Sequence, residues 1–353
     1  ISGYVEYGHG KRALECYQQM KQAQILPDVI TYICTLKACA SVRDINKGCL
    51  LHEEIVEKGF LDRDLALGNT LVDMYAKFGL LMKARKVFDV LRLRNVVSWN
   101  ILISGYVTHG QGEEALECFE EMSNQGIEPD SASYISGLKA CSLLRALYMG
   151  RKIHAEIERQ GLLHRDPFIG STLVDMYAKV GLLNKAQKVL ESLRIRSVVS
   201  WTTLIAGYTQ HGNGEAALEC FNRMKSEGIP PNAITYVWSL KACTNMGAID
   251  KGGEIHDEIE RRGLLQKDLI GNTLVNFYAK CGVLPKAEQA FDKLGGRDVV
   301  SWTALMAGYA QVRNCGKVFY IFNVMQGEGI KPNMVTFVVL LSMCSKIGLV
   351  HKC

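Results

Sequence analysis

The chain has 353 residues, enough for two or three ordinary domains, and 48% of them are apolar, which provides ample material for a core. Charged residues make up 22% of the sequence, which excludes a chain disordered throughout, and the formal net charge of +5 is compatible with an anionic partner. No apolar run approaches the ~18 residues of a membrane-spanning helix, and the opening ISGYVEYGHG carries no signal or transit pattern, so we expect no membrane partner.

Three short segments recur along the chain at a spacing of about 102 residues, which indicates an internal repeat. LKAC occurs at 36–39, 138–141 and 240–243, ALEC at 13–16, 115–118 and 217–220, and VVSW at 96–99, 198–201 and 299–302. One period divides into three units of 35, 36 and 31 residues, which are 96–130, 131–166 and 167–197.

Each unit is expected to form two helices. In the stretch 69–91 the first apolar stripe comprises Leu71, Tyr75 and Ala76. Gly79 interrupts the pattern, and the second stripe comprises Ala84, Val87, Phe88 and Leu91. A hairpin of this size cannot bury both stripes alone, so neighbouring units must stack and share a continuous core. Period-2 alternation is absent, and the sequence therefore predicts one all-α solenoid over 1–353 without an internal domain boundary.

The ends of the units distinguish tetratricopeptide from pentatricopeptide arrays. GIEPD at 126–130, GIPPN at 228–232 and GIKPN at 329–333 resemble the end of a pentatricopeptide repeat, and VVSWN followed by ILISGY resembles its opening. The alternating lengths resemble the P, L and S repeat classes of plant pentatricopeptide proteins: SWTTLIAGY looks like the P class, LKAC the L class and LVDMYAK the S class. The resemblance covers the whole chain and implies a right-handed superhelical solenoid of stacked two-helix hairpins.

We name each unit by the class that it resembles. The P-type units are 1–28 (partial), 96–130, 198–232 and 299–333. The L-type units are 29–64, 131–166, 233–268 and 334–353 (partial), and the S-type units are 65–95, 167–197 and 269–298. Ile1 aligns with Ile103 in mid-helix, and another repeat would normally cover the last apolar run, FVVLL. We therefore expect a fragment cut at both ends.

The resemblance implies binding of single-stranded RNA, one base per repeat, read by the fifth and the last residue of each unit. The fifth residues assigned to P-type and S-type units are polar: Asn100, Thr202, Thr303, Asn69, Ser171 and Asn272. Those of L-type units cannot form hydrogen bonds: Ile33, Ile135, Val237 and Val338. L-type units should therefore mainly space the RNA. The family also implies that the apolar second residues sandwich the bases, here Val97, Val199, Val300, Ile30 and Ile234.

The last residues of the units allow a second interpretation. They are Asp28, Asp64, Asn95, Asp130, Asp166, Ser197, Asn232, Asp268, Asp298 and Asn333. All are favoured N-cap types and each precedes an expected helix, so capping alone could explain them. The polar fifth residues favour RNA reading, because a purely structural array would not require Asn or Thr inside these first helices.

The family's pairing rules predict a base order. Asp accepts hydrogen bonds from the ring N–H of U or G, whereas an Asn amide suits A or C, and a fifth-position Asn favours pyrimidines over purines. Asn100 with Asp130 and Asn272 with Asp298 should read U. Thr202 with Asn232 and Thr303 with Asn333 should read A, Asn69 with Asn95 should take C or U, and Asp28 leaves G or U. Ser171 with Ser197 receives no base. From 5′ to 3′ the order is G/U, any, C/U, U, any, any, A, any, U, A, any.

Two charged features bear on the phosphate backbone. Lys77, Lys179 and Lys280 end the first helices of S-type units, where they could contact phosphate or serve as cations favoured at a helix C-terminus. The second helix of the P-type unit, GEEALECFEEM, carries five glutamates within 112–122, so it should face away from RNA.

Segments that partly match catalytic motifs are better explained as recurring structural positions of the repeat. His52, His154 and His256 each begin an H-x-E triplet, half of a zinc-deaminase signature, but they recur at the repeat spacing and C-x-x-C is absent from the sequence. Cysteines also recur in fixed positions, such as Cys39, Cys141 and Cys243, and should be small buried hydrophobes. No P-loop or nucleophile elbow occurs.

The sequence therefore predicts a non-enzymatic RNA-binding solenoid with no cofactor, metal or small-molecule substrate. The family context implies a chloroplast or mitochondrion and site recognition for C-to-U RNA editing, with RNA-editing factors or a deaminase acting in trans or in a missing C-terminal domain. The alternative is a helical scaffold that binds protein.

Overall fold

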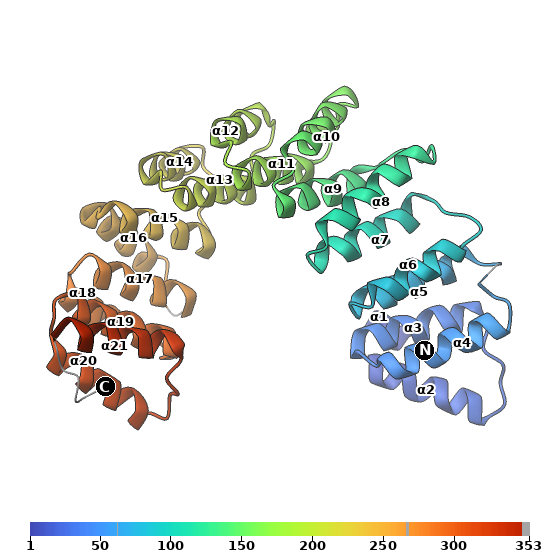
Figure 1. Cartoon of the computed structure of the whole chain (residues 1–353), viewed down its shortest axis with the longest axis horizontal. Helices are drawn as coiled ribbons and strands as arrows, with labels where there is room; N and C mark the ends of the chain where they lie inside the picture. Colours follow the sequence, from blue (N-terminus) through green and yellow to red (C-terminus); the bar gives the residue numbers. More distant parts are fainter. Residues whose placement is uncertain (62, 266–267, 348–353) are drawn as a thin grey trace. The chain divides into compact units, whose positions relative to one another are not determined.

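The computed structural model describes residues 1–61, 63–265 and 268–347, without the side chains at 164, 268, 346 and 347 (Figure 1). Over these ranges the chain forms α-helices and a short 3-10 turn but no strand, which confirms the predicted all-α class. None of the helices in these ranges is long and apolar enough to cross a membrane. The chain divides into two compact blocks, where the sequence predicted one uninterrupted solenoid: an N-terminal block, Ile1–Val180, and a C-terminal block, Gly181–Cys353.

The helices alternate regularly between the two arms of each hairpin. The N-terminal block contains α1 (Ser2–Glu6), α2 (Gly10–Gln22), α3 (Val29–Val42), α4 (Ile45–Glu57), α5 (Leu65–Lys77), α6 (Leu81–Val90), α7 (Val96–Thr108), α8 (Gly112–Asn124), α9 (Ser131–Leu144), α10 (Leu147–Arg159), η1 (Leu162–His164) and α11 (Pro167–Lys179). The C-terminal block contains α12 (Leu183–Ser192), α13 (Val198–Gln210), α14 (Gly214–Ser226), α15 (Ala233–Met246), α16 (Ile249–Arg261), α17 (Asp268–Lys280), α18 (Leu284–Asp292), α19 (Val299–Gln311), α20 (Cys315–Gly327) and α21 (Met334–Ile347). From α3 onward, odd numbers are the first helices of the units and even numbers the second helices.

First helices form a continuous layer within each block. In the N-terminal block α3, α5, α7, α9 and α11 pack one against the next, and in the C-terminal block α13, α15, α17, α19 and α21 do the same. Second helices cover this layer from one side: α8, for example, packs against both α7 and α9. Sharing of each apolar face between neighbours is what an isolated hairpin could not achieve.

Small residues allow the first helices to approach closely. A Cβ atom added to Gly105 of α7 would lie 2.8 Å from the Cβ of Ala76 in α5, so α7 fits against α5 only without a side chain there. Trp99 of the same helix is fully buried, and its ring meets that of Phe88 edge to face with centroids 4.6 Å apart. The turn after α5 uses Gly79 at φ +74°, in the left-handed region, as its predicted helix-breaking role requires.

The helix starts agree with the predicted positions in the repeat, apart from one unit boundary. The fifth residue of each first helix from α3 on is a residue that the sequence assigned to this place: Ile33, Asn69, Asn100, Ile135, Ser171, Thr202, Val237, Asn272, Thr303 and Val338. However, α17 begins at Asp268, so the predicted boundary after Asp268 is wrong by one residue, and Asp268 does not precede the helix as a cap. The connection 262–267 is one residue shorter than 58–64 and 160–166, which shifted the count.

Candidate nucleic-acid interface

A groove of about 760 Å³ opens on the layer of first helices in the N-terminal block. Its lining includes Asp73 and Lys77 of α5, Val97 and Asn100 of α7, and Asp130 directly before α9. The structure thus brings together two predicted base readers, one predicted sandwiching residue and one predicted phosphate contact. These side chains meet in the groove because they lie on one face of consecutive first helices.

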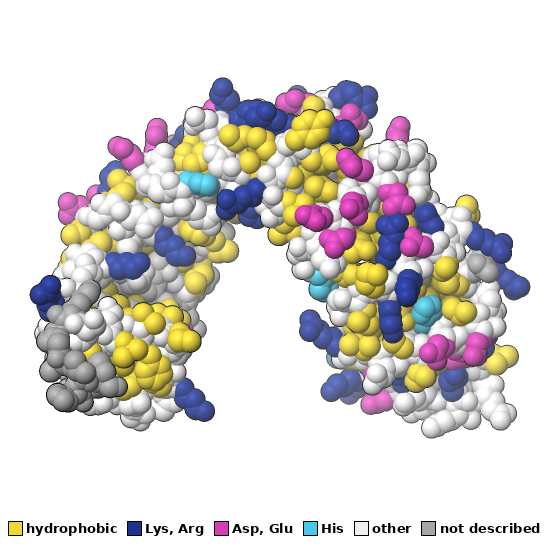
Figure 2. All heavy atoms as spheres, in the orientation of Figure 1, with side chains coloured by type: hydrophobic (Ala, Val, Ile, Leu, Met, Phe, Trp, Pro, Cys, Tyr) yellow, Lys and Arg dark blue, Asp and Glu magenta, His cyan; other side chains and the backbone are white. Residues whose placement is uncertain are grey.

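The glutamate-rich helix α8 lies apart from this groove. It contributes no residue to the lining, although five glutamates fall within its first eleven positions. Figure 2 shows acidic side chains gathered over the region of α8. An anionic polymer in the groove would therefore not meet these carboxylates directly.

Asn100 and Asp130 are joined by a hydrogen bond across one P-type unit. The Asn100 Nδ2 amide donates to Asp130 Oδ1 at 2.9 Å, and the Ser133 hydroxyl donates to Asn100 Oδ1 at 2.6 Å. Burial raises the pKa of Asp130, but the hydrogen bonds donated by Ser133 and Asn100 outweigh burial and hold this pKa below its ordinary value. Asp130 is therefore a carboxylate at neutral pH, and its Oδ2 makes no hydrogen bond within the described residues.

The S-type pair of the C-terminal block is joined by the same kind of hydrogen bond, but here both carboxylate oxygens are used. The Asn272 Nδ2 amide donates to Asp298 Oδ2 at 3.0 Å, while Asp298 Oδ1 accepts from the backbone of Val300 and Ser301. An Asn in fifth position thus holds the terminal Asp in both blocks.

Threonine in fifth position produces a different arrangement. Thr202 Oγ1 lies 2.7 Å from Thr235 Oγ1, which donates to Asn232 Oδ1 at 3.0 Å. Thr303 reaches Asn333 in the same way, through Thr336, at 2.8 and 3.1 Å. Since Oδ1 of each Asn is used in this way, the Nδ2 amide points elsewhere and makes no hydrogen bond to any described residue. Asp-terminated units therefore present an acceptor, and these Asn-terminated units present a donor.

The terminal residues of the units cap the helices that follow them. Each terminal residue whose side chain is described caps the next helix through one oxygen, and these residues are Asp28, Asp64, Asn95, Asp130, Asp166, Ser197, Asn232, Asp298 and Asn333. The capping interpretation is confirmed for these nine. Capping uses Oδ1 of Asp130 and Asn232, so Oδ2 of Asp130 and Nδ2 of Asn232 stay available for a ligand, whereas Oδ2 of Asp298 already accepts from Asn272.

Two of the predicted pairs differ from this pattern. Asn69 is buried, its Oδ1 has no partner among the described residues, and no hydrogen bond joins it to Asn95. Asn95 forms a capping box with Ser98 instead. Ser171, in the N-terminal block, donates to the Pro167 carbonyl at 3.1 Å. Ser197, in the C-terminal block, caps α13.

Apolar side chains stand exposed at the second position of the first helices. Val97, Val199, Val300, Ile30 and Ile234 are each half to two-thirds exposed, so packing does not explain their apolar character. Three residues that the sequence analysis did not single out share the position and the exposure: Phe168, Leu269 and Val335. Applying the second-position rule to every predicted unit would have found Phe168 and Val335, but the misplaced boundary at Asp268 would have selected Ile270 instead of Leu269.

The predicted phosphate lysines are not all equivalent. Lys77 forms an ion pair with Asp73 at 2.6 Å, and Lys179 forms one with Asp175 at 2.8 Å, both on exposed surface. Lys280 has Asn276 at the corresponding place and no ion pair within the described residues. Exposed pairs of this kind contribute about 0–1 kcal/mol, so a phosphate could displace the aspartates.

A second set of lysines, which the sequence analysis missed, lies on the L-type first helices. Lys37, Lys139 and Lys241 are the ninth residues of α3, α9 and α15, one turn beyond the apolar fifth residues. All three are exposed, and none has an ion pair in the described part of the chain; Lys241 Nζ lies 4.4 Å from the centre of the Trp238 ring. Ala132 and Ser136 of α9 line the groove, and Lys139 follows on the same helical face. The sequence signal for these lysines was the repeated LKAC segment, in which each is the second residue.

The histidines of the H-x-E triplets occupy one repeated structural position, as predicted. His52, His154 and His256 each lie with Nδ1 2.9 Å from a tyrosine hydroxyl of the next first helix, those of Tyr75, Tyr177 and Tyr278. Burial lowers the pKa of His52 and His256, which keeps both imidazoles neutral. Among the described residues, no three His, Cys, Asp or Glu side chains are grouped closely enough to hold a metal ion.

The repeated cysteines behave as core residues. Cys39, Cys141 and Cys243 are fully buried in the first helices of L-type units. Burial raises the pKa of each thiol to about 12, so all three are protonated and unreactive at neutral pH.

Comparison with known proteins agrees with this geometry. The model of the PPR repeat family matches residues 1–41, 94–142, 196–245 and 297–346, and the model of the PPR repeat matches 69–96 and 171–198. Two similar proteins of Arabidopsis thaliana are the pentatricopeptide repeat-containing proteins At4g18520, chloroplastic, and At3g09040, mitochondrial. The first is 34% identical over 99% of this chain and 56% of its own length; the second is 35% identical over 99% of this chain and 34% of its own length. The chain thus spans about a third to just over half of these relatives.

Solved structures share the fold. The crystal structure of the pentatricopeptide repeat protein PPR10 in complex with an 18-nt psaJ RNA element has a TM-score of 0.70 and 18% identity, covering 98% of this chain and 57% of that one. PPR10 from maize gives a TM-score of 0.53 with 19% identity, covering 99% of this chain and 61% of that one. From the family models, which match more than half of its residues, the chain belongs to the pentatricopeptide repeat family.

Proposed function

We propose that the chain binds single-stranded RNA in a sequence-specific way, one base for each P-type or S-type unit. The observation that carries the proposal is the contrast between two kinds of joined side chains. Asn100 holds an Asp130 carboxylate that retains a free acceptor, whereas Thr202, through Thr235, holds an Asn232 that retains a free donor. Uracil presents a ring N–H and adenine a ring acceptor at the corresponding edge, so the two units should choose different bases.

The surroundings of these pairs suit RNA better than a protein partner. Exposed aliphatic side chains such as Val97 flank the readers and could pack against base faces. Lysines of S-type and L-type units lie along the same helical faces and could contact phosphates. A protein scaffold is the alternative, and it gives no reason for the paired polar side chains.

The proposed base order is the one that the sequence predicts, with the N-terminus toward the 5′ end of the RNA. The hydrogen bonds that support it are those of Asn100 with Asp130, Asn272 with Asp298 and the two Thr–Thr–Asn series. Lys37, Lys139 and Lys241 join Lys77, Lys179 and Lys280 as proposed phosphate contacts.

The wider role is also a proposal. We infer that RNA binding serves recognition of a C-to-U editing site in a chloroplast or mitochondrion, with the deaminase supplied outside this chain. The alternation of unit lengths, which resembles the P, L and S classes, supports the editing role. The names of the two Arabidopsis relatives, chloroplastic and mitochondrial, support the compartment alone. The purified chain should therefore leave cytidines unchanged, with or without added zinc, and C-to-U conversion by the chain alone would refute this division of labour.

The sharp test exchanges one reader pair for the other. The double variant Thr202→Asn with Asn232→Asp recreates the Asn100–Asp130 arrangement, since Thr235 can donate its hydroxyl as Ser133 does. Preference at the seventh base should change from A to U by about tenfold, the value of roughly one good base-edge contact, without change elsewhere. Binding of RNAs that differ only at this base would be measured by gel shift.

The matched control is Asn213→Asp. Asn213 caps α14 through Oδ1, which accepts from the Ala216 N–H at 3.3 Å, but it belongs to a second helix. This variant should leave base preference unaltered. If the double variant binds the two RNAs in the same ratio as the wild type, Thr202 and Asn232 only support the helix, and base reading fails at this unit. A pooled-RNA gel shift without any retained RNA would favour the scaffold.

A further inference from the structure

Three equivalent junctions join the second helix of a P-type unit to that of the following L-type unit. They are α2 with α4, α8 with α10, and α14 with α16, and the repeat gives each an equivalent glutamate: Glu54, Glu156 and Glu258. In the first junction Lys21 Nζ lies 2.7 Å from Glu54 Oε2, and in the third Lys225 Nζ lies 2.5 Å from Glu258 Oε2. In both, a tyrosine hydroxyl donates to the same carboxylate at 2.8 Å.

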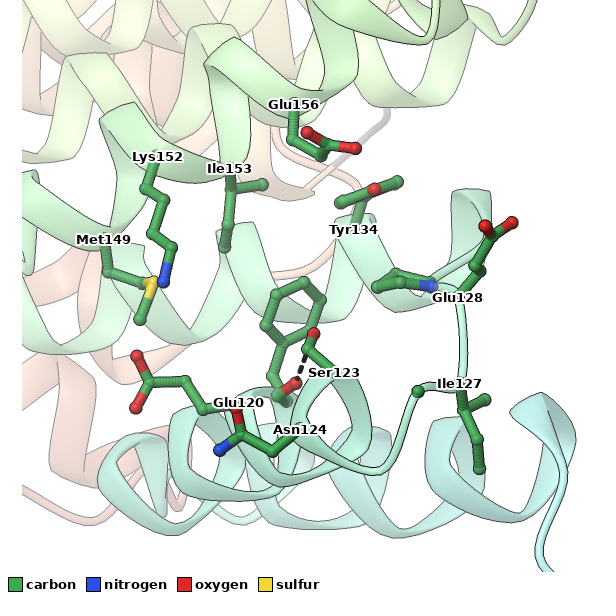
Figure 3. A pocket seen from close by; sticks show the side chains of 13 residues that line it. Glu120, Ser123, Asn124, Ile127, Glu128, Tyr134, Met149, Lys152, Ile153 and Glu156 are labelled. Carbon is green, nitrogen blue, oxygen red and sulfur yellow. Dashed lines mark hydrogen bonds between the residues drawn. The ribbon is translucent and has the colours of Figure 1, made fainter.

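The middle junction lacks this lysine. Ser123 takes its place, and its hydroxyl donates to the Phe119 carbonyl at 3.2 Å (Figure 3). Glu156 is held instead by Arg159 and Gln160 of its own helix, and its side chain is 36% exposed, compared with 19% for Glu54 and 10% for Glu258. The Glu156 carboxylate is thus more exposed than those of Glu54 and Glu258, and within the described residues no lysine of the preceding unit pairs with it.

A pocket occupies the vacated space. Its volume is about 640 Å³, against about 400 Å³ and 320 Å³ at the sister junctions. Figure 3 shows Glu120 and Ser123 of α8 on one side of it and Lys152 and Ile153 of α10 on the other. Phe119 and Tyr134 also line the pocket. Three carboxylates line the pocket, those of Glu120, Glu128 and Glu156, with Lys152 as the one cation in this lining. The sister pockets have more cations than carboxylates in their linings.

An aromatic ring marks where the missing ammonium group belongs. Lys21 Nζ lies 5.8 Å from the ring centre of Tyr17, and Lys225 Nζ lies 5.3 Å from that of Phe221. Phe119 is the equivalent residue of the middle junction and lines the pocket. Phe119 can therefore receive a cation as its two counterparts do, since the face of a ring attracts ammonium groups.

We propose that the pocket between α8 and α10 binds an alkylammonium group, which takes the position that Lys21 and Lys225 occupy at the sister junctions. The ammonium pairs with Glu156 and lies over Phe119, while its methylene chain packs against Tyr134 and Ile153. Arg159 gives up Glu156 readily, because Arg159 is 70% exposed and such exposed pairs contribute little. A lysine of a protein partner and a free aliphatic polyamine share this chemistry.

The test is a titration of the RNA-free chain with 1,5-diaminopentane and, separately, with the acetylated and amidated tripeptide Gly-Lys-Gly. Methyl NMR signals of Met149 and Ile153, which line the pocket, report binding. Both signals should shift with at least one probe. A shift with the tripeptide identifies a protein lysine as the source, and a shift with the diamine alone identifies a free polyamine; absence of a shift with either overturns the proposal.

Two variants fix the location. Ser123→Lys supplies the missing ammonium group, so it should raise the melting temperature and weaken probe binding at least about tenfold. Equal binding by wild type and Ser123→Lys would mean only general attraction to acidic surface and would refute the pocket. The matched control, Lys225→Ser, should create a new site whose probe binding shifts the Ile255 methyl signal. These measurements involve no RNA, so their failure leaves the proposed RNA binding untouched.

Discussion

The neighbouring first helices α7 and α9 have similar helical structures but carry different side chains on the groove face. Each begins after a capping residue, Asn95 or Asp130, and each packs against the next first helix of the layer. On the groove face, however, α7 carries Val97, Asn100 and Ser104, whereas α9 carries Ala132 and Ser136. The fifth residue of α9 is the apolar Ile135, and its ninth is the exposed Lys139. In the proposed function, α7 therefore offers hydrogen bonds to a base and α9 offers a charge.

The largest effect on RNA binding is expected from removal of the positive charges on the L-type first helices. We expect the triple variant Lys37→Ala, Lys139→Ala, Lys241→Ala to bind all RNAs more weakly by about the same factor. Each phosphate contact contributes about −0.7 to the slope of log K against log salt, so six lysines predict roughly −4 for the wild type and about −2 for the variant. If wild type and variant bind equally at 1 M salt, this difference in slope corresponds at 50 mM salt to a loss of about four-hundredfold.

The control removes the same charge from second helices. Lys86, Lys188 and Lys251 are exposed on α6, α12 and α16, outside the layer of first helices. Their triple Ala variant should nearly retain the wild-type slope. If both triple variants lose slope equally, the attraction is diffuse and the L-type helices have no special part in it.

A smaller effect, on base preference, is expected from a change at the end of the P-type unit 96–130. Asp130→Asn should change preference at the fourth base from U toward C by about tenfold, because the free acceptor becomes an amide. The melting temperature should hardly change, because Asp and Asn are nearly equal caps. The control is Asp166→Asn: Asp166 caps α11 at the end of an L-type unit, accepting from the Phe168 N–H at 2.9 Å. A change of base preference in this control would contradict the distinction between the two kinds of unit.

The smallest effect concerns the histidines of the L-type second helices, which the P-type second helices lack at that position. Burial lowers the pKa of His52 and His256, so the folded protein binds fewer protons than the unfolded chain below about pH 6.5. The free energy of unfolding should therefore be fully retained above that pH and decrease as the pH falls through it. Denaturant titrations at about pH 7.5 and 5.5 measure the difference, and the double variant His52→Gln, His256→Gln should reduce it. An unchanged pH dependence would assign it to other groups.

Much of the fold and part of the site could be predicted from the sequence, because both follow the repeat. Asn100, Thr202 and Thr303 fall on the fifth helical position since identical cores impose identical helix starts. The boundary at Asp268 could not be placed from the period, because a connection one residue shorter leaves the helices intact.

Contacts between units were harder to predict. The link from Thr202 to Asn232 passes through Thr235, the third residue of the next unit, and no pattern within a single unit contains it. By contrast, the pairing of Lys77 with Asp73 was available from their spacing of four residues on one helix. The open pocket at Ser123 is visible in the sequence only after the sister junctions show what Lys21 does there.

The capping boxes of Asp130 and Asn232, at the ends of two P-type units, have a consequence for how such a protein changes over generations. Asp130 and Asn232 are oriented before any ligand arrives, because Oδ1 of each is tied to the next helix by a backbone N–H. Exchanging Asp for Asn there costs only a few tenths of a kcal/mol in folding. Under the proposed function, a lineage can therefore change the preferred base one unit at a time, with a single point mutation and without passing through an unstable intermediate. The same proposal implies that an engineer can retarget the chain while leaving its scaffold alone.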